Sequence, residues 1–324
     1  ALYNYILIPN KTGYDYNYDQ IVHFGEIFST IIVSEYLNTS GYANDWVDIR
    51  EIFKTNSNFR EGIIDWDLSE KNVKNAFHFE DINCYVSQGF IASNENNEPT
   101  TLGREGSDYS AAIFAYSLGA ESVTIWKDVP GVLNADPRYF ENALLLNQIS
   151  YREAIELAFY GASVIHPKTL QPLQKKEIPL FVKSFINPLL PGTSVSKGED
   201  LEPKTPCFIV KKEQLLLSLS SIDFSFIIEE NISEIFALFH QYKIKVSLIQ
   251  NSAISFSVCI EDKFGNFREL KNILSKKFKV SYNEKVSLYT IRHFDEKAAK
   301  MVEKDKTVLL KQISRETMQI VTKE

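Results

Sequence analysis

The stretch T-L-G-R-E-G-S-D at residues 101–108 decides the fold and points to the chemistry. It places two glycines, an arginine, a hydroxyl and a carboxylate at the start of a predicted helix, residues 107–118, with Ser107 as its first residue. A helix start attracts anions because its first backbone N–H groups have no partners within the helix. Arg104 offers a planar fork suited to a carboxylate or phosphate, and Gly103 and Gly106 let backbone amides approach a ligand closely. Taken alone, the pattern is also typical of a glycine turn with a solvated arginine and a capping serine.

A second informative segment, I-W-K-D-V-P-G-V at residues 125–132, begins at the end of a predicted strand, residues 122–126. Open α/β sheets bind ligands at the carboxyl ends of their strands. The segment continues as L-N-A-D-P-R at 133–138, which adds a turn and a second arginine able to hold phosphate. An ordinary charged loop is the alternative interpretation.

Strands and helices alternate around these two segments. The helix signals are Asp19 as an N-cap, a capping box from Ser150 to Glu153, Pro167 in a first turn, and glycine stops at Gly119 and Gly161. Strands are predicted at residues 46–49, 84–91, 122–126 and 178–182. This alternation predicts an α/β fold whose mostly parallel sheet is covered by helices on both faces.

A connector rich in proline and glycine, residues 191–206, marks a domain boundary near residue 200. Beyond it, period-two strands and amphipathic helices follow in the order βαββαβ and then a shorter βαββ. We therefore expect one domain at 1–200 and two small α/β modules within 201–324. Strands covered by helices on one face leave sheet edges, so pairing with a second copy is plausible.

Composition excludes several classes of protein. The 324 residues include 44% hydrophobic and 24% charged residues, a mix typical of chains that bury cores, and 35 basic against 42 acidic residues give a net charge of −7. This charge disfavours non-specific binding to nucleic acid or to an anionic membrane. Cys84, Cys207 and Cys259 form no C-x-x-C pattern, the histidines show no metal-ligand spacing, and no apolar run is long enough to span a bilayer. We expect a cytoplasmic protein without a metal cluster.

The quoted segments resemble those of the aspartate kinases in the amino-acid kinase superfamily, which read close to T-L-G-R-G-G-S-D and D-V-x-G-V-x-x-x-D-P-R. Three further segments match in the same order: F-G-E with S-T at residues 24–30, F-Y-G-A-S-V-I-H-P at 159–167, similar to F-G-A-K-V-L-H-P, and N-P to P-G-T at 187–193. The tail after residue 206 is similar to paired ACT domains, the amino-acid-sensing modules of this family.

The resemblance implies a three-layer αβα amino-acid kinase fold followed by ferredoxin-like ACT modules. It implies transfer of the γ-phosphoryl group of ATP, with Mg²⁺, to the β-carboxylate of L-aspartate, which gives 4-phospho-L-aspartate on the route to lysine, threonine and methionine. It also implies a homodimer formed through the ACT modules and feedback by an amino acid, lysine first and threonine second.

Site residues follow from the same resemblance, position by position. Arg104, Ser107 and Asp108 are the expected catalytic residues, and the expected aspartate contacts are Glu61, Gly103, Arg104 and Gly106. Nucleotide contacts are expected at Lys127, Asp128, Leu133, Arg138, Ser163 and Val164. The effector is expected near Ser247, Asn251 and Ser252.

Two departures keep other interpretations open. The family begins with a strand and a K-F-G-G loop, and nothing like it occurs before residue 20. Ser163 stands where the family pattern has a nucleotide-binding lysine. Another kinase of the superfamily, such as an acetylglutamate or uridylate kinase, is one alternative, which the Arg104 segment and the ACT-like tail disfavour. A catalytically silent amino-acid sensor is another, favoured by the missing lysines and disfavoured by the intact segment at residues 101–108.

Overall fold

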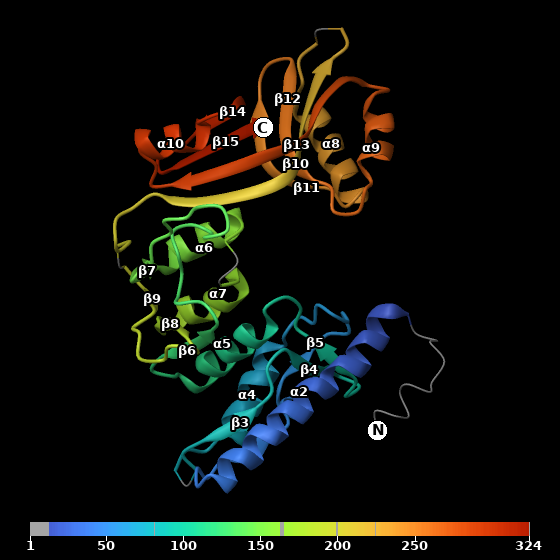
Figure 1. The fold of residues 1–324 in the computed structure, drawn as a ribbon. Coiled ribbons are helices and arrows are strands. Elements are labelled where there is room, and N and C mark those ends of the chain that lie inside the picture. Colours follow the sequence, from blue (N-terminus) through green and yellow to red (C-terminus); the bar gives the residue numbers. More distant parts are fainter. Residues whose placement is uncertain (1–12, 81, 163–164, 199, 224, 324) are drawn as a thin grey trace. The chain divides into compact units, whose positions relative to one another are not determined.

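The computed structural model describes residues 13–80, 82–162, 165–198, 200–223 and 225–323 (Figure 1). The described chain forms two compact units. The first holds the chain up to residue 132, residues 145–158 and the stretch ending at 202, and the second holds residues 133–144, 159–162 and those from 203 onward. The second unit thus contains two short segments that come from the middle of the chain.

Helices and short sheets alternate in the first unit. Its helices are α2 (Tyr14–Thr39), α3 (Ile49–Ile52), α4 (Trp66–Ala76), α5 (Gly106–Leu118), α6 (Tyr151–Tyr160), whose last two residues belong to the second unit, and α7 (Pro167–Lys176). Its strands are β1 (Asp45–Val47), β2 (Lys54–Thr55), β3 (Tyr85–Ser87), β4 (Ile91–Asn94), β5 (Pro99–Thr101), β6 (Val123–Lys127), β7 (Gln148–Ser150), β8 (Leu180–Ser184) and β9 (Thr193–Ser196).

Most strand pairs of the first unit are parallel, as the alternation of strands and helices predicts. The sheets have the orders β1-β3, β2-β4-β5 and β6-β8-β9-β7. The pairs β1-β3, β2-β4, β6-β8 and β7-β9 are parallel, and β4-β5 and β8-β9 are antiparallel. The α/β class expected from the sequence is confirmed.

Several local signals act as predicted. Gly119 ends α5 in the left-handed conformation, with φ of 64°. The backbone N–H of Glu153 donates to Ser150 Oγ at 3.1 Å, one half of the predicted capping box. Pro167 begins α7, and His166 caps this helix, because its Nδ1 accepts a hydrogen bond from the backbone N–H of Lys168 at 3.1 Å.

Two element boundaries differ from the prediction. Helix α2 begins at Tyr14, so Asp19 is not an N-cap but a buried residue in the second turn. The predicted strand at 84–91 is two strands, β3 and β4, because Phe90 adopts a φ of 70° that interrupts the extended backbone. Residues 88–90 form the resulting break, which lies next to the start of α5.

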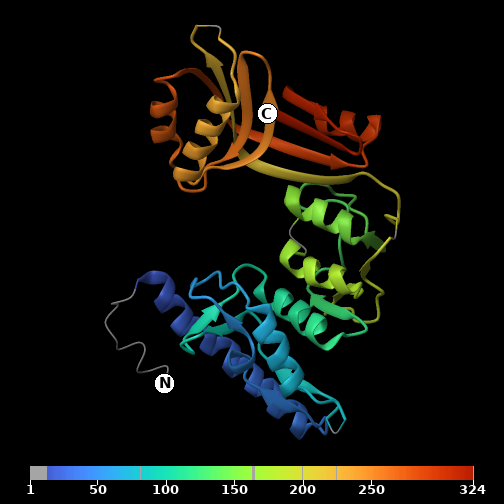
Figure 2. The same ribbon diagram turned by 180° about the vertical axis from the view of Figure 1, so that it is seen from behind.

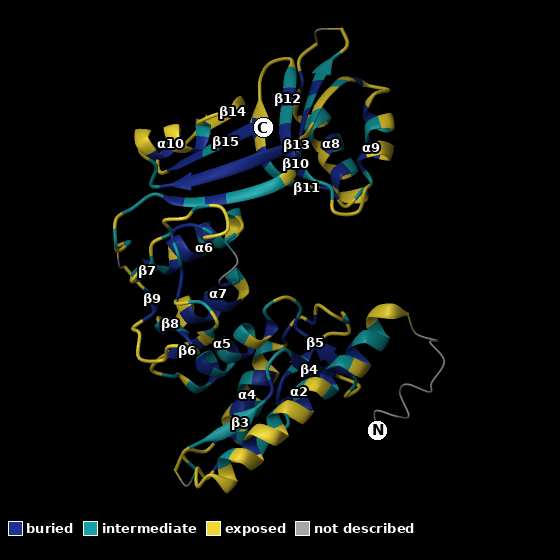
Figure 3. Ribbon diagram, viewed as in Figure 1, coloured by how far each residue is buried: buried dark blue, intermediate teal, exposed yellow. Residues whose placement is uncertain are grey.

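The apolar core of the first unit lies between α2, α4 and α5 and the short strands. Phe53 and Ile113 are fully buried in it, and burying such side chains contributes roughly 1.5–3 kcal/mol each. Figure 3 shows α2 with buried residues along one side and exposed residues along the other. The core therefore anchors α2 and α5, which carry residues of the site.

The second unit is built on one six-stranded antiparallel sheet with the order β11-β12-β10-β13-β15-β14. Its elements are β10 (Cys207–Ser221), α8 (Glu229–Gln241), β11 (Lys245–Asn251), β12 (Ser255–Glu261), α9 (Phe267–Leu274), β13 (Phe278–Arg292), α10 (Glu296–Glu303), β14 (Thr307–Ile313) and β15 (Thr317–Lys323). Helices α8 and α9 lie together on one face of the sheet, as the view from behind also shows (Figure 2). The order of elements is the ferredoxin-like one expected for ACT modules.

The two modules share their central strands. β10 and β13 have 15 residues each. Their pairing register shifts between Lys211 and Leu216, and Glu213 and Lys285 have positive φ angles of 55° and 54°. One half of this pair joins β11, β12, α8 and α9, and the other half joins β14, β15 and α10.

Candidate active site

The stretch 101–108 forms the end of β5, a tight loop and the first turn of α5. Gly103 has a φ of 80°, and Glu105 enters the helix in the left-handed conformation with φ of 54°. The backbone N–H of Gly106 donates to the carbonyl of Gly103 at 3.1 Å. The helix starts at Gly106, so Ser107 lies in the first turn instead of capping it.

The loop at residues 88–90 packs tightly against this helix start. A Cβ at Gly89 would lie 2.8 Å from Ser107 Cα, and a Cβ at Gly106 would lie 2.7 Å from Phe90 Cδ2. The backbone N–H of Phe90 donates to Ser110 Oγ at 3.0 Å. The position of Ser107 is therefore fixed from the side as well as by its own helix.

Arg104 and Glu61 lie on neighbouring loops. The side chain of Arg104 is 75% exposed, and its Nε is 3.9 Å from the Glu105 carboxylate. A Cβ at Gly103 would lie 3.6 Å from Glu61 Cγ, and the backbone N–H of Gly62 donates to the carbonyl of Thr101 at 2.8 Å. The structure thus brings together the residues expected to contact the carboxylate and the α-ammonium of one amino acid.

Asp108 connects this loop to the second informative segment. Lys127, the last residue of β6, donates from Nζ to Asp108 Oδ2 at 2.8 Å. Both side chains are mostly buried, at 22% and 15% exposure. The expected catalytic carboxylate and one expected nucleotide contact therefore touch each other, whereas Asp128 is exposed at the following position.

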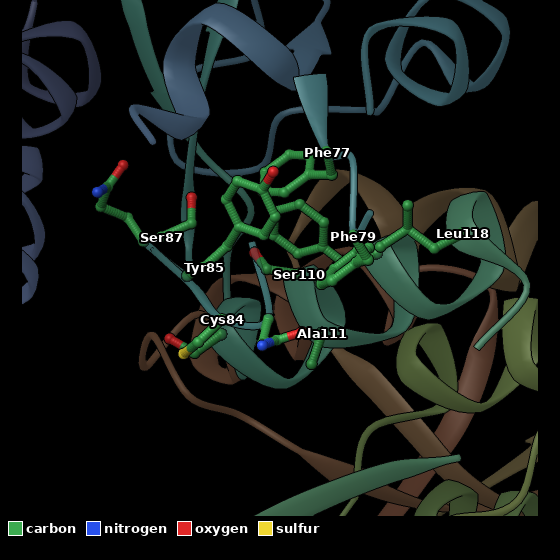
Figure 4. A pocket seen from close by; sticks show the side chains of 13 residues that line it. Phe77, Phe79, Cys84, Tyr85, Ser87, Ser110, Ala111 and Leu118 are labelled. Atoms are coloured by element: carbon green, nitrogen blue, oxygen red, sulfur yellow. The ribbon is translucent and has the colours of Figure 1, made fainter. Parts of the chain in front are cut away.

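A cavity of about 560 Å³ extends along α5, from Ser107 in its first turn to Leu118 at its end (Figure 4). Ser107, Gly89 and Gln88 line its polar part, and the rings of Phe77, Phe79, Tyr85 and Phe114 with Leu118 line its apolar part. Figure 4 shows the rings of Phe77, Tyr85 and Phe79 near one another, with Ser110 and Ala111 presented by α5. Only the polar part suits an anionic substrate, because apolar side chains give a charged group no hydrogen bonds to replace those it loses from water.

The other residues expected to contact the nucleotide do not all lie in the first unit. Leu133 and Arg138 belong to the second unit, where Arg138 Nη2 lies 2.6 Å from Asp136 Oδ2. This hydrogen-bonded pair lowers the pKa of the Asp136 carboxyl. Ser163 and Val164 lie outside the described residues. Arg138 therefore already has a carboxylate partner within its own turn.

The three expected effector residues lie along β11 and the turn that follows it. Ser247 Oγ accepts a hydrogen bond from Lys211 Nζ at 3.2 Å, next to a cavity of about 30 Å³, which holds about one water. Asn251 ends β11, and Ser252 Oγ is 2.7 Å from Ser255 Oγ in the turn. Four strand residues span about 13 Å, so Ser247 does not share one pocket with Asn251 and Ser252.

Asp19 is a site-forming residue that the sequence did not reveal. Its carboxylate is fully buried and accepts hydrogen bonds from the backbone N–H groups of Arg60 and Thr101, at 2.8 and 3.0 Å, and from Thr101 Oγ1 at 2.9 Å. These residues flank Glu61 and the 103–104 turn. The F-G-E segment that follows Asp19 in the same helix is the signal that could have drawn attention to it.

Two further properties of the described residues concern metal sites and membrane-spanning helices. Within the described ranges, no three His, Cys, Asp or Glu side chains are grouped so that they could hold a metal ion. In the same ranges, no helix combines the length and the apolar character that crossing a membrane requires.

Comparison with characterised proteins gives consistent relatives. The lysine-sensitive aspartokinase 3 of Escherichia coli (strain K12) is 34% identical over 244 residues, which cover 75% of this chain and 54% of that protein. Aspartokinase 1, chloroplastic, of Arabidopsis thaliana is 33% identical over 254 residues, which cover 75% of this chain and 43% of that protein. The chain spans about half the length of these curated relatives.

Solved structures agree with the sequence relatives. The structure of E. coli aspartokinase III in complex with lysine and aspartate (T-state) matches with a TM-score of 0.77 at 27% identity, covering 96% of this chain and 73% of that chain. The same values hold for the complex with aspartate and ADP (R-state). The aspartate kinase of Clostridium acetobutylicum has the same fold, with a TM-score of 0.78 at 22% identity, covering 95% of this chain and 72% of that chain.

The family model for the Amino acid kinase family matches residues 4–184, which is more than half of the chain. The match includes the loop at 101–108, the start of α5 and the end of β6, the segments that the site geometry brings together. The chain belongs to the Amino acid kinase family.

Proposed function

We propose that the protein is an aspartate kinase, which transfers the γ-phosphoryl group of ATP to the β-carboxylate of L-aspartate and releases ADP and 4-phospho-L-aspartate. The observation that carries the proposal is the contact between Lys127 Nζ and Asp108 Oδ2 at 2.8 Å. It joins the strand end expected to hold the nucleotide to the helix start expected to hold aspartate. The relatives named as aspartokinases support the same substrate pair.

The chemistry needs charge neutralisation more than a general base. A carboxylate with an ordinary pKa near 4 is already ionised at pH 7, so the nucleophile is ready without a proton acceptor. Two anions must instead be held in line while charge spreads over the transferring group. Preorganised donors serve this purpose because they need no rearrangement at the moment of reaction.

Each site residue then has a task. Arg104 binds the α-carboxylate of aspartate, and Glu61 pairs with the α-ammonium across the turn at Gly103. The backbone N–H of Ser107, in the first turn of α5, donates toward the reacting oxygens. Asp108 holds Lys127 at the transfer site, where its ammonium faces the phosphate. ATP is expected to bring Mg²⁺ with it, and no step of this proposal runs through the ion.

Regulation by an amino acid is the second part of the proposal. We propose that the effector binds beside Ser247, and that Asn251 and Ser252, which lie about 13 Å further along β11 and in its turn, do not contact the same ligand. Lys211 Nζ bonds to Ser247 Oγ, and two ammonium groups about 4 Å apart repel by roughly 4 kcal/mol near a protein surface. The carboxylate of an effector, not the side-chain ammonium of lysine, should therefore meet Ser247. Pairing of copies through the sheet edges at β11 and β14 would form the homodimer.

The decisive test is product formation by the purified protein. With ATP and L-aspartate, hydroxylamine should trap the acyl phosphate as a hydroxamate in step with ADP release. Assays with N-acetylglutamate or uridine monophosphate as the phosphoryl acceptor distinguish an aspartate kinase from the other kinases of the superfamily. Binding of aspartate or lysine without any hydroxamate would support the silent sensor instead.

A further inference from the structure

Asp19 connects helix α2 to both loops that carry the proposed aspartate contacts. It is 0% exposed, yet its carboxylate takes three hydrogen bonds from residues that lie 41 and 82 positions further along the chain. One bond holds Arg60, which directly precedes Glu61. The other two hold Thr101, which lies three residues before Arg104.

The two loops also hold each other. The backbone N–H of Gly62 donates to the carbonyl of Thr101 at 2.8 Å, and a Cβ at Gly103 would lie 3.2 Å from the carbonyl oxygen of Arg60. Misplacement of a catalytic or binding group by about 1 Å can cost an active site up to about 10²-fold in rate. A buried anchor that contacts both loops limits such movement.

Asp19 does not serve an ion pair. The guanidinium of Arg60 bonds to Asp15 at 3.0 Å, and among the residues that the structure describes no cationic side chain lies within ion-pair distance of Asp19. Burial raises the pKa of the Asp19 carboxyl despite the three hydrogen bonds. The three hydrogen bonds to Arg60 and Thr101 are therefore the contacts that compensate for burying this carboxylate.

We infer that Asp19 is a positioning residue, which fixes Glu61 and Arg104 in the arrangement that binds the α-ammonium and α-carboxylate of the substrate. The inference rests on the proposed function. It concerns aspartate alone, because the Asp19 hydrogen bonds reach residues beside the aspartate contacts and none of the nucleotide contacts.

Two substitutions at Asp19 distinguish the role of its hydrogen bonds from the role of its negative charge. Asp19→Ala removes all three acceptor contacts. Asp19→Asn can keep them, because the amide oxygen can accept from the two backbone N–H groups while the amide N–H₂ donates to Thr101 Oγ1. We expect aspartate to bind about tenfold or more weakly to the Ala variant, while the Asn variant stays within about threefold of the wild type.

Thr101 supplies a milder test if Asp19→Ala does not fold. Thr101→Val removes the hydroxyl bond and should weaken aspartate binding about threefold to tenfold, whereas Thr101→Ser keeps the hydroxyl and should restore it. Gln20→Met is the matched control. Gln20 is buried next to Asp19 and donates to the carbonyl of Pro99 at 2.9 Å, so its loss should change the unfolding midpoint without changing aspartate binding.

The measurements are calorimetric aspartate binding, KM for aspartate and for ATP, and thermal unfolding, all on the full chain. A rise in aspartate KM with ATP KM constant, and rescue by Asp19→Asn, support positioning. Three outcomes would overturn it. The KM values for aspartate and ATP could change equally, or only kcat could fall, in proportion to the folded fraction. The third is an Asn variant that binds aspartate as weakly as the Ala variant does. Wild-type protein that binds no aspartate would refute the proposed function itself.

Discussion

Lys127 and Asp108 form a hydrogen-bonded ion pair, with Nζ 2.8 Å from Oδ2, between the last residue of a parallel strand and the first turn of a helix. The two residues are 19 positions apart in the chain, and the rest of α5 after its first turn lies between them. The pair closes the strand–helix unit at the end where open α/β sheets bind ligands. It is both a structural contact and the centre of the proposed transfer site.

Lys127→Met should lower both stability and activity. The Asp108 carboxylate would remain mostly buried without its partner, which costs about 1–3 kcal/mol of unfolding free energy, and the rate of transfer should fall about 10²- to 10³-fold. Urea unfolding of Lys127→Met, Asp108→Asn and the double variant measures the coupling. Strictly additive losses would show that the pair does not interact energetically.

Arg104→Ala should affect aspartate and little else. Because the side chain is 75% exposed, the unfolding free energy should stay within about 0.5 kcal/mol of the wild type. The aspartate KM should rise about ten- to 150-fold, equivalent to about 1.5–3 kcal/mol, and the ATP KM should not. Arg104→Lys should recover only part of the loss, because lysine lacks the planar fork. An unchanged aspartate KM would remove Arg104 from the site.

Gly89→Ala should displace the start of α5. The new Cβ would lie 2.8 Å from Ser107 Cα, so backbone must shift, which costs about 1–3 kcal/mol and should reduce kcat. Gly25→Ala is the control, since nothing lies within 4 Å of its Cβ position in α2. The control should gain about 0.5–1 kcal/mol from higher helix propensity. Circular dichroism melts of both variants test this, and a neutral Gly89→Ala would contradict the tight packing.

Ser163→Lys should tighten binding of Mg-ATP, because the substitution places an ammonium where the family resemblance expects one. The gain should be larger at low than at high salt, as for any contact between exposed charges. Calorimetry at two ionic strengths measures it. Equal affinities at both would mean that residue 163 does not contact phosphate.

Asp19→Asn should change how stability depends on pH. Burial raises the pKa of Asp19 in the folded protein above its ordinary value of 3.8. The stabilising contribution of this carboxyl is therefore complete below the unfolded-state pKa and is lost as the pH rises through the folded-state pKa. In urea unfolding, the free energy of unfolding of the Asn variant should therefore increase relative to that of the wild type as the pH rises from about 4 to 7. A constant difference would mean that Asp19 titrates normally.

Signals that act within one or two turns could be predicted from the sequence. The stop at Gly119, the Ser150 cap and Pro167 in the first turn of α7 each depend on residues a few positions apart, and each is in the expected place. Arg104 and Asp108 could be singled out for the same reason, because glycines, a cation and a carboxylate lie within one short stretch.

Contacts between distant segments could not be predicted in this way. Asp19 looked like an N-cap because aspartate commonly starts helices, but its partners lie 41 and 82 residues away. The strand predicted at 84–91 fails at Phe90, whose positive φ fits the loop packed on Ser107, and apolar composition does not reveal such a constraint. The separation of Ser247 from Asn251 likewise depends on strand length and not on their nearness in sequence.

The long strands β10 and β13 have a consequence for how the second unit comes apart. Because each strand belongs to both modules, melting one module would leave half of a 15-residue strand without partners. The modules should therefore lose their structure in a single all-or-none transition. Hydrogen exchange along β10 should report the same opening free energy on both sides of the register shift between Lys211 and Leu216. Excising either module would then damage the other.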